Sequence, residues 1–324
     1  MAKIKVVSTF AGIGGSSEGY KRAGLKPSAA IEMIEHVAKQ YRVNFPTTPV
    51  ILSDIREVTG DMIEDTIGGK VDILDGSPPC ECFTTARNGS PSSWNRTVEY
   101  KGKRQRIDNL WGEQIRLVSE TKPKCFVIEN VPGMTIGIAK RLLQNSMLEL
   151  SKLGYRVETK LLNAMYFNCA TSRTRLFCIG LRKDITTKKQ LHPNPQTKPI
   201  TVQEAIKNAQ IPKHEMEWSL SCGSGRAAKR YIGVGKLKAY KYKVYGFTTS
   251  AVARNKPLVS PLGKAELYLD KRMLTPTELK LCFSFYPSWK LDHRPGKAFE
   301  GIAEGMPPNL ISAIGKHLFS ILYK

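Results

Sequence analysis

Two cysteines, Cys80 and Cys82, follow a pair of prolines at the end of an apolar run. The stretch reads D-I-L-D-G-S-P-P-C-E-C-F over residues 72–83. Prolines restrict the backbone in front of Cys80, and a cysteine thiolate is a nucleophile whose pKa, about 8.5 when unperturbed, falls near cations. The polar segment that follows is unusual around a core cysteine. The pattern predicts that Cys80 is a nucleophile, with packing or metal binding as alternatives, and we interpret Cys82 as a packing residue.

Acidic side chains follow three other apolar runs of strand-like composition. Glu32 ends the run 27–32, Asp54 follows the run 50–52, and Glu129 lies in F-V-I-E-N. An acid after the second strand of a nucleotide-binding fold accepts ribose hydroxyls. We therefore expect Glu32 to bind a nucleoside and Asp54 to meet its adenine amine. Partial burial of Glu129 would favour its protonated form. Ordinary surface acids and a helix cap are the alternatives.

Glycines and arginines complete the set of candidate residues. F-A-G-I-G-G (10–15) stands where the first strand turns into a helix, and glycines there let a ligand approach the backbone and the free helix amides. The motif differs from G-x-G-x-x-G, so a dinucleotide fits poorly. Arg173 and Arg175 are two positions apart and on a strand would point to the same face. They are interpreted as binding phosphate or carboxylate, or as forming a structural salt bridge.

Strands and helices alternate through the first 180 residues and would position these side chains. Strand-like runs occupy residues 4–10, 27–32, 50–52, 71–76, 124–130, 156–163 and 175–181. Helical patterns cover residues 16–24, 34–45, 110–122 and 137–154. Such alternation predicts an α/β fold with a doubly wound, mostly parallel sheet. Ligands bind such sheets at the carboxyl ends of the strands.

The pattern changes after Arg182, where a polar, proline-bearing stretch begins. Residues 200–271 lack the strand–helix rhythm of the first part. We expect residues 1–182 plus about 297–324 to form one domain and residues 183–296 to form a smaller, irregular domain.

Helical patterns return near the C-terminus, at residues 274–285 and about 307–322. Thr275 is the predicted N-cap of the first of these helices, with Pro276 in its first turn.

Composition restricts the class of protein. The chain has 324 residues, seven cysteines and a formal net charge of +22. A positive charge of this size indicates a polyanionic partner, most simply nucleic acid, with a basic but uninvolved surface as the alternative. The cysteines lack zinc-site spacing. Apolar runs stay shorter than the ~18 residues of a membrane span, and the start lacks a signal-peptide shape. We expect an intracellular protein with free thiols and no membrane association.

The order of the motifs resembles that of the DNA cytosine-5 methyltransferases. F-A-G-I-G-G, S-P-P-C, E-N-V, R-x-R, R-M-L-T-P-T-E-L and G-M-P-P-N-L-I-S-A-I-G follow one another with family-like spacing. The resemblance covers nearly the whole chain apart from about residues 190–270. It implies a Rossmann-like methyltransferase fold, S-adenosylmethionine as cofactor without a metal ion, and double-stranded DNA as partner. It also makes residues 1–182 plus about 297–324 the catalytic domain and residues 183–296 the target-recognition domain.

The resemblance implies roles for single residues. Cys80 would be the nucleophile. Glu129 and Arg175, with Arg173 beside them, would bind the target cytosine. The residues that the resemblance places at the cofactor are Phe10, Gly12, Gly14, Glu32, Met33, Asp54, Ile55, Leu110 and Glu304.

Three positions depart from the family's usual pattern. Glu81 follows the nucleophile where Gln or a small residue is more usual, Thr171 stands where Gln is expected, and Glu304 stands where Asn is common. That Asn lies near the methionyl part of the cofactor. We expect Glu304 to turn outward while a backbone group takes the place of the Asn side chain.

The chemistry of the implied reaction accounts for these residue types. Attack of the Cys80 thiolate on carbon 6 of cytosine would make carbon 5 nucleophilic enough to take a methyl group. Glu129 would hydrogen-bond N3, and Arg175 would hold the 2-carbonyl. Loss of the carbon-5 proton and elimination of Cys80 would restore the ring. The base must be flipped out of the duplex to be reached.

Two basic segments are expected to hold the DNA. Residues 81–108 are rich in Lys and Arg, and residues 226–243 carry basic side chains and interleaved tyrosines without an acidic residue. The second segment stands where the family has its target-recognition region. Lysines there would hold phosphates, whereas Arg226 and Arg230 are candidates for reading guanine. The predicted nucleic-acid-binding residues are Arg87, Arg226, Lys229, Arg230 and Lys238. A solvated basic face is the alternative.

Two other functions remain open. One is a tRNA cytosine-5 methyltransferase on the same scaffold, and the other is a catalytically inactive nucleic-acid-binding relative. The presence of Cys80, Glu129 and Arg175 argues against the inactive relative. We further expect a monomer encoded by a prokaryote or a phage, with a cognate restriction enzyme as a candidate partner.

Overall fold

A computed structural model describes residues 4–79, 98–100, 103–105, 109–223 and 274–323. The chain forms two compact units. The first comprises Met1–Leu162, Thr174–Asn194 and Ser312–Lys324, and the second comprises Asn163–Arg173 and Pro195–Ile311. The expected functional division into a catalytic and a target-recognition domain stays a prediction.

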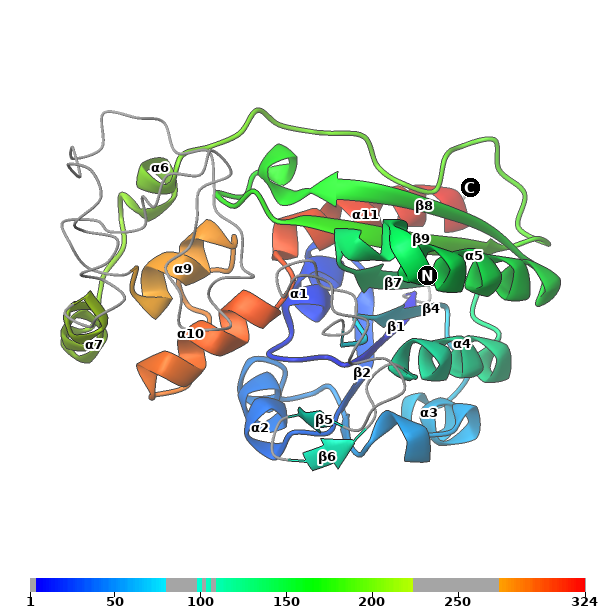
Figure 1. Cartoon of the computed structure of the whole chain (residues 1–324), viewed down its shortest axis with the longest axis horizontal. Helices are drawn as coiled ribbons and strands as arrows, with labels where there is room; N and C mark the ends of the chain where they lie inside the picture. The colour runs from blue at the N-terminus through cyan, green and yellow to red at the C-terminus, as the bar shows by residue number, and fades with distance from the viewer. Residues whose placement is uncertain (1–3, 80–97, 101–102, 106–108, 224–273, 324) are drawn as a thin grey trace. The chain divides into compact units, whose positions relative to one another are not determined.

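A seven-stranded sheet forms the centre of the first unit (Figure 1). In spatial order its strands are β3 (Val50–Leu52), β2 (Lys26–Glu32), β1 (Lys5–Thr9), β4 (Ile73–Gly76), β7 (Cys125–Asn130), β9 (Thr174–Arg182) and β8 (Tyr155–Asn163). The pairs β1–β2, β2–β3, β1–β4 and β4–β7 are parallel, whereas β7 and β9 are antiparallel. The short strands β5 (Val98–Tyr100) and β6 (Lys103–Gln105) form a separate antiparallel pair. The predicted α/β class with a mostly parallel sheet is confirmed.

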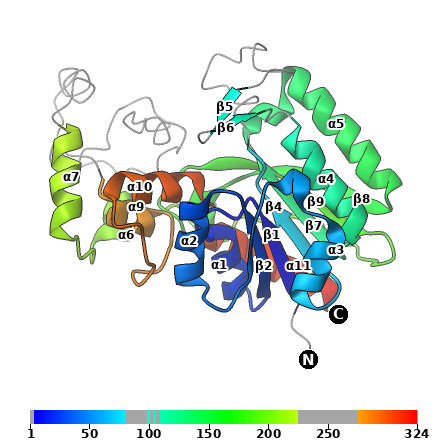
Figure 2. The same ribbon diagram turned by 90° about the horizontal axis from the view of Figure 1, so that it is seen from below.

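Helices cover both faces of this sheet (Figure 2). The helices α3 (Gly60–Ile67), α4 (Leu110–Thr121) and α5 (Gly137–Lys152) lie on one side, and α1 (Gly15–Arg22) and α2 (Glu35–Asn44) lie on the other. Alternate residues of a strand point to opposite faces. Val7 and Leu74 therefore join the core cluster that includes residues of α4, whereas Ser8 and Asp75 bond side chains of α1.

The last helix, α11 (Pro308–Leu322), matches its predicted range closely. Its C-terminal part packs against α1, because a Cβ on Gly315 would lie 2.8 Å from the Cβ of Ala23. In the part of the chain that the structure describes, no helix combines the length and apolar composition needed to cross a membrane.

Several elements of the first unit were not predicted. These are α3, the short strands β5 and β6, and the short 3-10 turns η1 (Ile55–Glu57) and η4 (Pro132–Thr135). The helix α3 begins at a glycine, a poor helix former, and a Cβ on Gly60 would lie 2.8 Å from the Cβ of Glu120 on α4. Close packing on α4 thus supports this helix. Its ends also carry local signals that sequence reasoning missed, because Thr59 accepts from the Met62 amide over 3.2 Å and the left-handed Gly68 follows its last residue. The strand predicted to start at residue 71 starts at 73, because the Asp72 carboxylate accepts from the Lys5 amide over 2.8 Å.

The second unit contains η5 (Ala164–Phe167) and the helices α6 (Val202–Ile206), α7 (Lys213–Gly223), α9 (Pro276–Cys282) and α10 (Pro295–Glu304). No element was predicted where α6, α7 and α10 form. The helix predicted at 274–285 is shorter, but its N-cap is confirmed. Thr275 accepts from the Glu278 amide over 3.2 Å, and Glu278 bonds the Thr275 amide over 2.8 Å. Glu215 of α7 accepts from the Thr277 amide over 2.8 Å, which joins α7 to α9.

Candidate active site

Glu129 and Arg175 form a buried ion pair near the carboxyl end of β7. The Arg175 Nε lies 3.0 Å from the Glu129 Oε1, and the two side chains are 14% and 9% exposed. The pairing offsets the cost of burying a carboxylate. The contact is not aligned as a hydrogen bond, and within the described part of the chain Oε1 has no hydrogen-bond partner. The structural salt bridge considered from the sequence is therefore present at Arg175, and the pair offers a carboxylate oxygen beside a guanidinium.

Asn130, the last residue of β7, holds the segment that leads to Cys80. Its Nδ2 donates to the Pro78 carbonyl over 3.3 Å, and its Oδ1 accepts from the Val131 amide over 2.9 Å. The first of these bonds holds Pro78 against the end of β7. Sequence reasoning missed this role of Asn130, although its place in E-N-V was a signal. Cys80 and Cys82 themselves lie outside the described residues.

The loop between β1 and α1 is tied to Glu32. The Glu32 Oε2 accepts from the Gly12 amide over 3.0 Å, and Oε1 accepts from the Ile34 amide over 2.9 Å. Gly12 has a φ of 55°, and no described atom lies within 4 Å of the place where its Cβ would stand. This open space suits a ligand that lies against the backbone. Gly14 differs, because a Cβ there would lie 2.8 Å from the Phe45 ring, so packing requires that glycine.

Two other predicted cofactor residues border this loop. Phe10 directly follows β1, is half-buried and packs against the core cluster. Its φ of 50° is uncommon for a residue with a side chain. Met33 directly follows β2 and is also half-buried. Both residues therefore keep part of their surface available at the carboxyl edge of the sheet.

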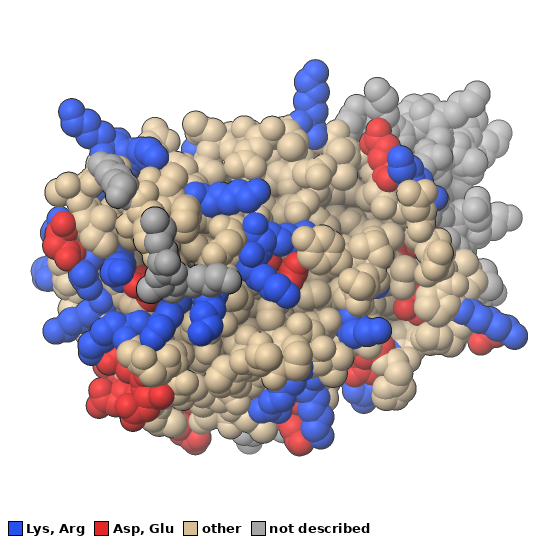
Figure 3. Space-filling model, turned by 180° about the vertical axis from the view of Figure 1, so that it is seen from behind, with Lys and Arg blue, Asp and Glu red and all other residues tan. Residues whose placement is uncertain are grey.

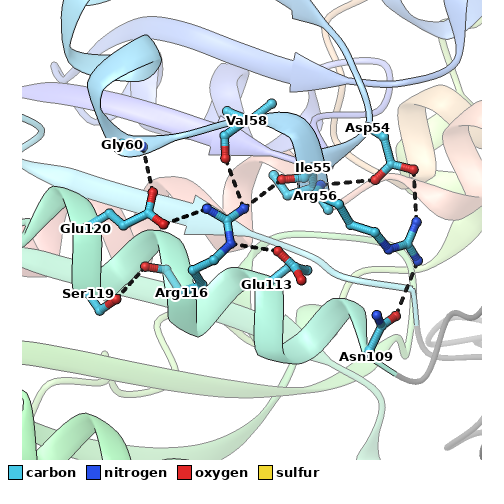
Figure 4. A network of polar contacts seen from close by, with 10 residues as sticks. All are labelled: Asp54, Ile55, Arg56, Val58, Gly60, Asn109, Glu113, Arg116, Ser119 and Glu120. Atoms are coloured by element: carbon cyan, nitrogen blue, oxygen red, sulfur yellow. Dashed lines mark hydrogen bonds and ion pairs between the residues drawn. The ribbon is translucent and has the colours of Figure 1, made fainter.

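Asp54 stands two residues after β3, and its carboxylate is engaged by Arg56 (Figure 4). The Asp54 Oδ1 accepts from the Arg56 amide over 3.1 Å, and Oδ2 pairs with the Arg56 Nη1 over 2.9 Å. The Arg56 Nη2 also donates to the Asn109 Oδ1 over 3.2 Å. Ile55 and Leu110 are buried in the same core cluster. Arg56 thus orients the Asp54 carboxylate, which is expected to accept a hydrogen bond from the adenine amine.

Arg173 and Arg175 do not share a strand face. Arg173 precedes β9 and lies in the second unit. There its Nη1 donates to the Ala303 carbonyl over 2.9 Å, and its Nη2 donates to the Glu304 carbonyl over 3.3 Å. These are the last residues of α10, where a cation is favourable. The two arginines would share a strand face only if both lay on the strand, and Arg173 does not, because β9 begins at Thr174. The side chain of Glu304 is exposed.

Asp75 is a buried carboxyl on β4 that sequence reasoning did not single out. It is 3% exposed, and its Oδ1 accepts from the Tyr20 hydroxyl over 2.9 Å. Burial raises the pKa of Asp75 to about 7, while hydrogen bonds from Tyr20 and Ser16 lower it and the nearby Glu129 carboxylate raises it. Asp75 therefore titrates near neutral pH on the strand that leads to Cys80. An acid inside an otherwise apolar run was the available signal.

The remaining predicted site residues lie outside the described residues. They are Arg87, Arg226, Lys229, Arg230 and Lys238. Among the residues that are described, no three or more His, Cys, Asp or Glu side chains are grouped so that they could hold a metal ion. Figure 3 shows Lys and Arg side chains at many places on the face in view, with acidic side chains among them and a group of acidic side chains at the lower left.

Comparisons of the sequence with known proteins identify relatives. The profile of the C-5 cytosine-specific DNA methylases matches residues 4–320. The type II methyltransferase M.PspPI of Psychrobacter sp. (strain TA137) is 28% identical over 350 residues, which cover 98% of this chain and 79% of that protein. M.AquIA of Picosynechococcus sp. is 33% identical over 193 residues, which cover 55% of this chain and 72% of that protein. M.Sau96I of Staphylococcus aureus is 32% identical over 192 residues, and the match spans 58% of this chain but only 41% of that relative.

Solved structures share the fold. A putative DNA modification methyltransferase encoded within an E. coli prophage superposes with a TM-score of 0.70 at 18% identity, covering 99% of this chain and 100% of that one. The S. pombe Dnmt2 methyltransferase superposes with a TM-score of 0.68 at 14% identity, with coverage of 99% and 100%. At such identities the likeness establishes the fold alone, in agreement with the sheet described above.

Proposed function

The chain belongs to the family of C-5 cytosine-specific DNA methylases and is a methyltransferase of cytosine in DNA, and from this premise we propose how it acts. It transfers a methyl group from S-adenosylmethionine to carbon 5 of cytosine in duplex DNA, through a covalent bond between Cys80 and the base. The observation that carries the proposal is the buried Glu129–Arg175 ion pair. Glu129 stands on β7, which pairs with β4, the strand from which the chain leads to Cys80, and Arg175 stands on β9 on the other side of β7.

The residues around the β1–α1 loop fit the adenosine part of the cofactor. Glu32 would accept the ribose hydroxyls, and the open space beside Gly12 would admit the nucleoside against the backbone. Asp54 would meet the adenine amine, and its orientation by Arg56 prepares it for that contact. When bound, the cofactor supplies an electrophilic methyl group on a sulfonium. Apolar walls would come from Phe10, Met33, Ile55 and Leu110.

Glu129 and Arg175 would bind the flipped cytosine. The Glu129 Oε1, which lacks a hydrogen-bond partner among the described residues, would bond N3 of the base. Arg175 would hold the 2-carbonyl, and the bond from its Nη1 to the Thr174 carbonyl, 2.8 Å long, pre-orients the guanidinium. In its acid form, Glu129 would stabilise the charge that develops on the ring.

The covalent steps follow from the chemistry of the ring. The Cys80 thiolate would attack carbon 6, forming a carbon–sulfur bond and raising the electron density at carbon 5. Carbon 5 would take the methyl group, with the donor leaving as a neutral thioether, and would then lose its proton to a base. The carbon–sulfur bond would break with return of its electron pair to Cys80, which restores the aromatic ring. Asn130 would support these steps by holding Pro78 and thereby the backbone ahead of the nucleophile.

Target choice is assigned to residues 183–296, and within them to the basic segment 226–243. The protein would act as a monomer on double-stranded DNA. A cognate restriction enzyme remains a candidate partner, since M.PspPI, M.AquIA and M.Sau96I carry type II methyltransferase names.

Mapping of 5-methylcytosine at single-base resolution tests the proposal. DNA from cells that produce the protein should carry the modification at one short, recurring sequence, and cells that produce Glu129→Ala should lack it. Purified protein should transfer labelled methyl from S-adenosylmethionine to duplex DNA and leave tRNA unlabelled. Labelling of tRNA alone would show that the substrate is RNA and would contradict the proposed DNA substrate. Absence of labelling on both would contradict the proposed reaction.

A further inference from the structure

We propose that Arg116, in the middle of α4, is a positioning residue for the adenine side of the methyl-donor site. Its guanidinium holds the backbone turn that carries Asp54 and Ile55, so α4 sets where these two residues stand. The inference rests on the proposed function, because Asp54 and Ile55 face a donor only if the chain binds S-adenosylmethionine. No motif of the sequence marks Arg116.

Arg116 bonds four groups at once (Figure 4). Its Nη2 donates to the carbonyls of Ile55 and Val58, each over 2.9 Å. Its Nε donates to the Glu113 Oε2 and its Nη1 to the Glu120 Oε1, each over 2.7 Å. The two carboxylates belong to α4 itself, so they fix the guanidinium on the helix. The two carbonyls belong to the turn, so the turn is held by the helix.

Glu120 continues the same network to the start of α3. While its Oε1 binds Arg116, its Oε2 accepts from the Gly60 amide over 2.7 Å. Gly60 also approaches α4 so closely that a Cβ there would lie 2.8 Å from the Cβ of Glu120. The chain from Ile55 to Gly60 is therefore attached to α4 at three backbone groups, namely two carbonyls and one amide.

The hydrogen bonds within the turn join only close neighbours in the chain. Within η1 the Glu57 amide donates to the Asp54 carbonyl over 3.0 Å, and the Val58 amide donates to the Ile55 carbonyl over 3.3 Å. Such short 3-10 turns have poor hydrogen-bond geometry. Contacts from outside must therefore fix the turn against the sheet, and Arg116 supplies two of them.

A second arginine ties the same turn to the beginning of α4. Arg56 binds the Asp54 carboxylate through its backbone amide and its Nη1, and its Nη2 donates to Asn109, the residue before α4. Leu110, the first residue of α4, is buried in the core cluster with Ile55. Asp54, Ile55 and Leu110, three of the residues expected at the cofactor, are thus held in place by one helix.

Only an arginine can make this set of contacts. Its planar guanidinium carries five donors in a fixed fork, whereas a lysine ammonium has three donors at one point. Arg116→Lys keeps the charge but cannot serve two carbonyls and two carboxylates together. We expect both Arg116→Lys and Arg116→Met to weaken donor binding about tenfold or more, the loss of a charged hydrogen bond or greater. The turnover rate at saturating donor and the affinity for DNA should stay close to those of the wild type.

The first measurement is amide hydrogen exchange of residues 53–60 in the ligand-free protein. Exchange in this segment should accelerate in both Arg116 variants and stay unchanged in Arg182→Met. Arg182 is a matched control, because it also binds a carboxylate, Asp184 over 2.8 Å, and a backbone carbonyl, that of Lys122 over 3.0 Å. It lies at the far end of β9, away from the turn.

The second measurement is the dissociation constant of S-adenosylmethionine by calorimetry, with the Michaelis constants for donor and DNA. A raised donor constant with unchanged turnover in both Arg116 variants supports the proposal. Faster exchange of residues 53–60 with unchanged donor affinity would make Arg116 a structural residue only and overturn it. Unchanged exchange and unchanged affinity would also overturn it. If Arg116→Met does not fold, the exchange and affinity measurements on Arg116→Lys alone decide whether the proposal holds. If the wild type binds no donor, the proposed function fails and this inference falls with it, while the exchange data still report whether Arg116 holds the turn.

Discussion

Cys80 and Cys82 are one residue apart, yet only Cys80 is expected to attack cytosine. Cys80→Ala should abolish methyl transfer, whereas Cys82→Ala should retain most of it, because we interpret Cys82 as a packing residue. DNA that contains 5-fluorocytosine should trap a covalent adduct, since fluorine cannot leave carbon 5 as a proton does. Mass spectrometry of the tryptic peptides should locate this adduct on Cys80. An adduct on Cys82 would show that the nucleophile was assigned to the wrong residue.

Asp75 makes the stability of the protein depend on pH. The carboxyl has an ordinary pKa of 3.8, and burial raises its pKa to about 7 in the folded chain. Between these values the folded chain holds a proton that the unfolded chain has released, so stability falls as pH rises. From pH 5 to pH 8, the wild type should lose about 3 kcal/mol of unfolding free energy relative to Asp75→Asn. Urea unfolding at both pH values measures this difference.

Asp184→Asn is the control for that experiment. A hydrogen bond from Arg182 lowers the pKa of Asp184. The contribution of Asp184 to the unfolding free energy therefore changes only below pH 5, outside the tested range. The unfolding free energies of Asp184→Asn and the wild type should therefore keep a constant difference between pH 5 and pH 8. The same constant difference for Asp75→Asn would mean that Asp75 is ionised throughout this range.

At the scale of elements, Glu32 joins the end of β2 to the loop between β1 and α1. It accepts from the amides of Gly12 and Ile34 and is expected to hold the ribose. Glu32→Ala should weaken S-adenosylmethionine binding by roughly 1.5–3 kcal/mol, the range for a lost hydrogen bond to a charged group. Calorimetry measures the change. Glu35→Ala is the control, because Glu35 is exposed on α2 and pairs only with Lys39 among the described contacts. Equal donor affinity in both variants would remove Glu32 from the site.

The basic segment 226–243 is the element expected to choose the target. Lys238→Ala should weaken binding to all sequences alike and reduce the salt slope by about 0.9, because a lysine on a phosphate displaces counterions. Arg226→Ala or Arg230→Ala should instead relax the preference at one base position, since arginine bonds guanine O6 and N7 together. Methylation of a randomised oligonucleotide pool and binding at several salt concentrations measure both effects.

Lys26→Ala is the control for the salt slope, because Lys26 is exposed at the amino end of β2, away from the carboxyl edge of the sheet. It should leave the slope and the site preference unchanged. If Lys238→Ala, Arg226→Ala and Arg230→Ala all behave like Lys26→Ala, recognition lies elsewhere, and the segment 81–108 becomes the candidate.

At the scale of the whole molecule, methyl transfer should need no metal ion. The sulfonium of the donor already makes its methyl group electrophilic, and the Cys80 thiolate activates the base covalently. Dialysis against a chelator should therefore leave both the rate of methyl transfer and the thermal midpoint unchanged. A metal-dependent nuclease, dialysed in parallel, shows that chelation was complete. Loss of activity that added metal restores would contradict this prediction.

The sequence by itself determined the fold class and the residues that follow the strands. Short apolar runs of strand-like composition and helical spacing are local signals, so they located β1, β2, β7 and β9 to within two residues. The cap at Thr275 was equally local, because its partner, Glu278, is three residues away. Since parallel strands end at one edge of a sheet, the sequence also placed Glu32, Asp54 and Glu129 near that edge.

Only the tertiary structure decided what these side chains contact. Arg175 and Arg173 are two positions apart, yet one pairs with Glu129 and the other binds carbonyls at the end of α10. Arg116 holds the carbonyl of Ile55 across 61 positions of the chain. The physical reason is that a hydrogen-bond partner and a degree of burial are set by whatever packing brings together, and sequence periodicity reports only which face of an element a residue occupies.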